Sequence, residues 1–312
     1  MVSRAALTVN VVPKSVLVAS EFSTASDRPL RHALAIARHF GAEFCLAHVV
    51  PPHGYTIGCA GAVRLAIDTA RRDSEQLNQQ LLQSGALAGL RHEFIVREGK
   101  VWEQLEQIIR EKHVDLLVIG THARQTLGKL LLGSVAEQIF RHADCLVLTV
   151  GPGSDQDSSI EQHQTLNAFL FATDFGAASL HALPYAVSFA NHFGARLILL
   201  HVLPTVPLPE GFHWSVTTED VTQMRENARL AVLPRLEELM SQQAPLAVKP
   251  EFIVKFGMPG EQILHAAHLR KADVIIMGLN RTAHADAASH LPWATAYHVV
   301  CGAACPVLTM RN

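Results

Sequence analysis

The chain has 312 residues, of which 49% are hydrophobic and 17% are charged, so it is long enough for about two globular domains. Its net charge of −2 excludes the strong positive charge typical of proteins that bind nucleic acid or anionic membranes. No apolar run reaches the roughly 18 residues of a membrane span, and the N-terminal stretch MVSRAALTVNVVPKS has no convincing signal-peptide cleavage site. The five cysteines lie mostly in apolar runs, which favours free thiols and a cytoplasmic location.

The first half of the chain alternates short apolar runs with segments of helical periodicity. Strands are predicted at residues 15–20, 44–50, 92–96, 115–120 and 145–150, because each run is apolar on both parities, as in strands covered on both faces. Helices are predicted at residues 27–41, 62–84 and 101–113, the first ending at Gly41 and the second at Ser84-Gly85. This alternation predicts right-handed crossovers and a parallel sheet of about five strands.

The second half repeats the first. KSVLVASEF (14–22) matches NAFLFATDF (167–175), EFIVREGKVWEQL (93–105) matches EFIVKFGMPGEQI (251–263), and DLLVIG (115–120) matches DVIIMG (273–278). Between the copies, GPGSDQDSSIEQHQT (151–165) has the composition of a linker. The sequence therefore predicts two repeated doubly wound α/β domains with five-stranded parallel sheets, residues 1–150 and 166–312, joined by residues 151–165.

A glycine-containing stretch follows the predicted fourth strand. Gly120 falls at the carboxyl end of that strand, where open α/β sheets bind ligands. Gly133 and Ser134 open the next predicted helix, SVAEQIFRH, whose unpaired N–H groups and positive dipole end suit an anion. Gly133 would let phosphate oxygens approach the backbone, and Ser134 would cap the helix or donate to a phosphate. The alternative is purely structural: Ser134 caps the helix and Gly133 makes the turn.

Two other phosphate motifs are excluded. A Walker A loop ending at Gly128-Lys129 would require glycine at Ala123 and serine or threonine at Leu130. The first strand, VLVASEF, is not followed by the glycines of a dinucleotide-binding fold. No metal site is predicted either, because no Asp, Glu or Cys completes a ligand set around the histidine pair His265 and His268 or around His284, His290 and His298.

Together these residues resemble the universal stress protein family. The family's signature, Gly-x2-Gly-x9-Gly-Ser after a fourth strand, corresponds here to Gly120, Ala123, Gly133 and Ser134, in the context LLLGSVAE. The strand ends ASEF and ATDF, the second strands ending in AHVV and LHVL, and the final strands CLVL and CPVL are also similar to the family. The resemblance covers both halves, from about Lys14 to Met310, and indicates a tandem universal stress protein.

The resemblance implies an adenine nucleotide alpha hydrolase-like sheet of strand order 3-2-1-4-5, with ATP, ADP or AMP between strands one and four and Mg²⁺ as an optional companion. Carried over to this chain, Ala19, Ser20, Glu21 and Val49 would bound the adenine and ribose. The ribose–phosphate side would be lined by Gly120, Thr121, His122 and Ala123, and the phosphates held by Gly133, Ser134, Val135 and Ala136. Two residues depart from the pattern: Ala123 replaces the second glycine, and Glu21 replaces the usual aspartate.

The second half keeps Asp174 and Gly278 but lacks the Gly-Ser pair. Leu291-Pro292 or Trp293-Ala294 stands in its place, depending on the alignment, and proline removes an N–H while tryptophan adds bulk. We therefore expect nucleotide in the first half alone, with the second half kept for packing; the alternative is a different ligand stacked on Trp293.

Two functional classes compete, and a third stays open. The first is a stress-response or regulatory module that binds an adenine nucleotide without catalysis. The second is an enzyme, a slow ATP hydrolase, and the third is a scaffold without nucleotide. No general base adjoins Gly133-Ser134 and no Walker lysine is present, which favours the module. The resemblance also implies that the two halves pair through their final strands as an intrachain pseudo-dimer, with a further homodimer as an option. No nucleic acid or membrane partner is predicted.

Overall fold

The structure of the protein is a computed structural model that describes residues 12–22, 27–52, 60–121, 132–151, 166–205, 217–280 and 290–312. Of the predicted linker, residues 151–165, the structure describes Gly151 alone. Residues 281–289, in the loop of the second half, lie outside the described residues. By contacts between residues the chain divides into two compact units, one formed by residues 12–164 with Leu308–Met310 and the other containing residues 165–307 with Arg311 and Asn312.

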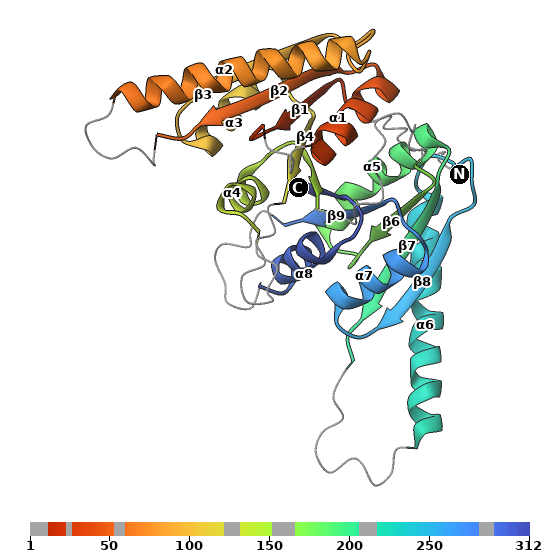
Figure 1. Cartoon of the computed structure of the whole chain (residues 1–312). Coiled ribbons are helices and arrows are strands. Elements are labelled where there is room, and N and C mark those ends of the chain that lie inside the picture. Colours follow the sequence, from red (N-terminus) through yellow and green to blue (C-terminus); the bar gives the residue numbers. More distant parts are fainter. Residues whose placement is uncertain are drawn as a thin grey trace. The chain divides into compact units, whose positions relative to one another are not determined.

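The first half contains a parallel sheet whose strands run in the order β3-β2-β1-β4-β5 (Figure 1). The strands are β1 (Ser15–Ala19), β2 (Glu43–Val50), β3 (His92–Glu98), β4 (Leu116–Gly120) and β5 (Leu146–Val150). The helices between them are α1 (Asp27–Phe40), α2 (Ala60–Gln83), α3 (Val101–Glu111) and α4 (Ser134–His142). Each strand and helix predicted from the sequence is present within about two residues, and the order is the expected 3-2-1-4-5.

The second half repeats this arrangement. Its strands run in the order β8-β7-β6-β9-β10, and they are β6 (Ala168–Ala172), β7 (Arg196–Leu203), β8 (Glu251–Phe256), β9 (Val274–Leu279) and β10 (Val307–Arg311). The helices are α5 (Ala177–Phe193), α6 (Thr218–Ser241), α7 (Pro259–Leu269) and α8 (His290–Gly302). The α/β doubly wound class is therefore confirmed for both copies.

The central strands form the core of each sheet. Val16, Leu17 and Val18 of β1 are 0% exposed, as expected for a strand covered by helices on both faces. Right-handed crossovers place α1 and α2 on one face and α3 and α4 on the other. The Trp102 and His142 rings, on α3 and α4, lie 6.1 Å apart, in agreement with that assignment.

A carboxylate fixes the amino ends of the central strands in both halves. One oxygen of Asp115 accepts hydrogen bonds from the N–H groups of Lys14 (2.7 Å) and Ser15 (3.1 Å), just before β1. In the second half, one oxygen of Asp273 accepts from the N–H groups of Asn167 (2.7 Å) and Ala168 (2.9 Å). The first strand and the fourth strand of each half are thereby held in register at the edge opposite to the carboxyl ends of the strands.

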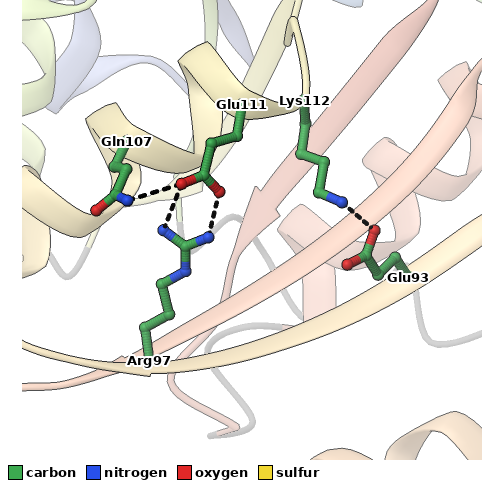
Figure 2. Close-up of polar contacts among 5 residues, drawn as sticks. All are labelled: Glu93, Arg97, Gln107, Glu111 and Lys112. Atoms are coloured by element: carbon green, nitrogen blue, oxygen red, sulfur yellow. Dashed lines mark hydrogen bonds and ion pairs between the residues drawn. The ribbon is translucent and has the colours of Figure 1, made fainter.

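A charged network joins α3 to β3, the outer strand of the first half's sheet (Figure 2). Glu111 of α3 receives hydrogen bonds from both guanidinium nitrogens of Arg97 and, at 2.7 Å, from the Gln107 amide. The Lys112 ammonium lies 2.6 Å from a carboxylate oxygen of Glu93. Charged side chains on an outer strand discourage pairing with other chains, so the network protects this edge while it orients the helix.

Candidate nucleotide site

The carboxyl ends of β1 and β4 lie side by side in the sheet. Val18 pairs with Val118, one residue before Ala19 ends β1 and two before Gly120 ends β4. The chain leaves these two strands in opposite directions along the sheet, so this is the switch point at which doubly wound sheets bind ligands. Val49 lies one residue before the end of β2, the other neighbour of β1, and is buried.

Two predicted site residues already have partners within the protein. The Ser20 hydroxyl accepts a hydrogen bond from the N–H of Phe22 (3.0 Å). Thr121 is buried, its N–H donates to the carbonyl oxygen of Val150 (3.0 Å), and its hydroxyl lies 3.5 Å from the same oxygen. Ser20 and Thr121 therefore shape the strand ends, while Glu21 is exposed at the same edge. His122 and Ala123 lie outside the described residues.

Helix α4 begins as predicted, but Ser134 does not cap it. Gly133 is the N-cap residue, with φ −62° and ψ 153°, and as a glycine it supplies no side-chain capping hydrogen bond. Ser134 is the first helical residue and is exposed, so the expectation that its hydroxyl closes the helix end is wrong. The reason is the register of the helix, which starts at Ser134, one residue earlier than serine capping requires.

The space above Gly133 is open in the part of the chain that the structure describes. A Cβ atom placed on Gly133 would meet no described atom within 4 Å, and the φ of −62° is one that any residue adopts. Neither packing against the described residues nor backbone conformation therefore accounts for a glycine here. The first-turn N–H groups of Ser134, Val135 and Ala136 have no acceptor within the helix, as at every helix start.

The electrostatics of this helix start suit an anion. The dipole of α4 places positive potential at its first turn. The one acidic residue of that turn, Glu137, is paired with Arg141 one turn later, at 2.7 Å. The pair largely offsets the negative charge of Glu137, so the helix end keeps its preference for a negatively charged ligand.

The corresponding edge of the second half is occupied by its own residues. One oxygen of Asp174 accepts from the N–H of Gly176 and from the hydroxyl of Ser179, both at 2.8 Å, and so closes the start of α5. A Cβ atom on Gly278 would lie 2.1 Å from the carbonyl oxygen of Ala178. Gly278 is thus required for close packing of α5 on β9, which is a structural reason for a glycine that the sequence associates with ligand binding.

Helix α8 extends further at its N-terminal end than α4, its counterpart in the first half. When their last residues, Gly302 and His142, are aligned, Ala294 corresponds to Ser134, and α8 begins four residues before it, at His290. Four residues extend a helix by about 6 Å. Backbone N–H groups that have no acceptor within the helix at the start of α4 therefore correspond to groups in the interior of α8, where N–H groups donate to the preceding turn. Trp293 lies within the first turn of α8, where only the backbone is described.

An aromatic pair stands at the same edge in both halves and was missed from the sequence. Phe22 stacks on His48 with ring centroids 4.7 Å apart, and the Nδ1 atom of His48 lies 2.7 Å from the carbonyl oxygen of Ser20. Phe175 and His201 repeat the arrangement at 4.6 Å. The signal was present in the sequence, because both the phenylalanine and the histidine recur at matching positions of the repeat.

Three of the thiols are shielded by burial. Burial raises the pKa of Cys45 and Cys145 to about 12 and that of Cys305 to about 11, so these thiols stay protonated and unreactive. Among the described residues no group of three or more His, Cys, Asp and Glu side chains is placed to hold a metal ion. None of the helices in the described parts of the chain is long and apolar enough to cross a bilayer.

Comparison with known proteins accords with this duplicated fold. A universal stress protein of Methanocaldococcus jannaschii is 26% identical over 138 residues, which are 44% of this chain and 81% of that protein. A universal stress protein of Mycolicibacterium smegmatis is 28% identical over 192 residues, covering 60% of this chain and 63% of its own. The crystal structure of a universal stress protein from Archaeoglobus fulgidus matches with a TM-score of 0.67 and 17% identity, over 97% of this chain and 98% of that one. The model of the universal stress protein family matches twice, at residues 13–151 and 166–311, and the chain therefore belongs to that family as a tandem member.

Proposed function

We propose that the protein is a regulatory module of the stress response that binds one adenine nucleotide, ATP, ADP or AMP, in its first half. The phosphates would lie at the start of α4, against Gly133 and the N–H groups of Ser134–Ala136, with the nucleoside toward the ends of β1 and β2. The observation that carries the proposal is Gly133, because neither its backbone conformation nor described packing explains the glycine, whereas close approach of a phosphate does.

A matched pair of substitutions tests the phosphate position. Asparagine and aspartate are both good N-cap residues, so Gly133→Asn and Gly133→Asp should leave the helix as stable as it is or slightly more so. Both fill the space above residue 133, but only aspartate adds a negative charge beside the phosphates. We expect calorimetry to show weaker ATP binding by the asparagine variant and at least about 100-fold weaker binding by the aspartate variant. An aspartate variant that melts normally and binds ATP like the wild type would refute the proposal.

The second half is proposed to bind no nucleotide. The supporting observations are the extended start of α8 and the close packing of Ala178 on Gly278. Titration of the full chain should therefore give one site per chain with ATP, ADP or AMP. Cyclic AMP belongs in the same series because a universal stress protein has been crystallised in complex with it. A stoichiometry of two would contradict the assignment, and mass spectrometry of nucleotide retained through purification would identify the natural ligand.

We also propose a cytoplasmic location and pairing of the two halves within the chain. The final strands are strongly apolar, with Leu146–Val150 buried throughout. An apolar strand left exposed at the edge of a sheet would pair with other chains, so we expect it to be covered. Small-angle scattering should then show a compact particle. Val147→Asp combined with Val307→Asp should expand it, and an elongated wild-type particle would argue against pairing.

A further inference from the structure

The second half places an aromatic ring between an imidazole and a guanidinium group at the carboxyl edge of its sheet. The ring of Phe175, which follows β6, contacts the His201 ring with centroids 4.6 Å apart and an angle of 46° between the ring planes. The guanidinium carbon of Arg235, from α6, lies 4.2 Å from the centroid of the same phenylalanine ring. Two groups this close to one centroid each need a face of the ring, so we place the histidine on one face and the guanidinium on the other. A guanidinium group thus lies over the outer face of Phe175 at cation–π distance.

The first half builds the same platform from equivalent residues. Phe22 stacks on His48 with an angle of 29° between the rings. Its φ is +54°, and that of Phe175 is +61°, a left-handed conformation that is uncommon for a bulky residue. Each is held by a hydrogen bond from its N–H to the hydroxyl of Ser20 or Thr173, both 3.0 Å long. Strain that recurs at one position of a duplicated fold indicates that the position of the ring matters.

The two platforms differ in what the neighbouring helix offers. Helices α2 and α6 are both 24 residues long, ending at Gln83 and Ser241. In this alignment Arg235 corresponds to Leu77, which has neither a planar nor a charged group. The second half therefore supplies its own planar cover for the ring, and the first half has an aliphatic residue in the equivalent position.

We propose that the outer face of Phe22 is the surface on which the base of the nucleotide stacks, and that Arg235 occupies the equivalent place in the second half. This inference rests on the proposed nucleotide function and adds its base-recognising residue. The Phe22 ring is half-buried at the edge where β1 ends, next to the switch point of the sheet. Stacking on an aromatic face selects a planar base without requiring hydrogen bonds to it. In the second half the equivalent ring, in contact with histidine, is occupied on its other side by the Arg235 guanidinium.

The first experiment separates the base from the phosphates. Phe22→Leu should weaken ATP binding about tenfold or more, because stacking on the ring is lost. It should leave the binding of inorganic tripolyphosphate, which has no base, unchanged. Phe22→Tyr retains the ring and should bind ATP like the wild type, and Phe175→Leu, the matched control in the second half, should affect neither ligand. Wild-type ATP affinity in a folded Phe22→Leu variant would overturn the inference.

A second experiment does not depend on the phosphate position. Adenosine carries the base without phosphate, and its ring current should shift the aromatic NMR signals of Phe22 and His48. The same shifts should survive in Gly133→Asp, whereas Phe175 should respond to adenosine only after Arg235→Leu uncovers it. If the Gly133 variants abolish ATP binding but adenosine leaves Phe22 unmoved, the stacking inference fails and the nucleotide function stands. If adenosine shifts Phe22 but the Gly133 variants bind ATP normally, the phosphate assignment fails and the platform stands.

Discussion

Removing the Asp115 carboxylate should loosen β1 in the first half while leaving the second half intact. In Asp115→Ala, the N–H groups of Lys14 and Ser15 lose their shared acceptor. Lys14 is exposed, so water replaces its lost bond at a cost of about 1 kcal/mol, whereas the buried Ser15 N–H is left unpaired at about 2 kcal/mol. The first half should therefore lose about 3 kcal/mol of stability, equivalent to a roughly 100-fold increase in the population of the open state. Asp115→Asn keeps one acceptor oxygen and should cost about half as much.

Hydrogen exchange followed by mass spectrometry locates the effect. Peptides covering β1 should exchange faster in Asp115→Ala, while those covering β6 should keep their wild-type rates. Asp273→Ala should show the converse, since Asp273 holds the N–H groups of Asn167 and Ala168 in the same way. Asp73→Ala, at an exposed position on α2, is the matched control and should change stability by less than about 0.5 kcal/mol. Equal protection of β1 in wild type and Asp115→Ala would refute the reasoning.

Three further outcomes are expected. Gly278→Ala should destabilise the second half by about 3 kcal/mol in thermal melts, because its Cβ atom would lie 2.1 Å from the Ala178 carbonyl oxygen. Gly133→Ala should cost about 1 kcal/mol or less, the loss of a better N-cap residue, and equal melting temperatures of the two variants would contradict this. Alkylating reagents at neutral pH should leave Cys45, Cys145 and Cys305 unmodified in the folded protein, because their thiol pKa values are raised to about 12, 12 and 11. Rapid labelling of these cysteines, detected by peptide mass spectrometry, would disprove this prediction. Hydrogen bonds from Arg97 and then Gln107 lower the pKa of Glu111 below its ordinary 4.5, so its contribution to stability is present above that pH and is lost as the pH falls through the lowered value. The melting-temperature difference between wild type and Glu111→Gln should accordingly be largest near neutral pH and vanish in acid; a difference that grows in acid would count against the network in Figure 2.

The positions of the strands and helices were predictable because local sequence encodes them. Apolar runs on both parities, such as the one that forms β4, are what a strand covered on both faces requires. Gly41 and Gly85 lie just beyond α1 and α2 with φ of 65° and 72°, a conformation that glycine adopts at little cost. The duplication then fixed the topology of the second half from that of the first.

The roles of individual site residues were less predictable, because they depend on which groups the folded chain brings together. The sequence suggested that Ser134 caps α4, but the helix register makes Gly133 the N-cap. Gly278 matched a ligand-binding glycine in sequence, yet the approach of Ala178 from α5 is what requires it. A glycine needed for packing and one needed for a ligand are identical in sequence and differ only in what lies above them.

By itself, the sequence determined the tandem α/β fold, the family and the position of the Gly-Ser pair after the fourth strand. These follow from periodicity, repeat and short motifs, all of which are local in the chain. Tertiary structure alone decided that Phe175 contacts both His201 and Arg235, that Asp174 accepts the hydrogen bond from the Gly176 N–H at the start of α5, and that no described atom lies within 4 Å of a Cβ placed on Gly133. Such contacts join residues from different strands and helices, and their energies depend on distances of a few ångströms that no local pattern of residues specifies.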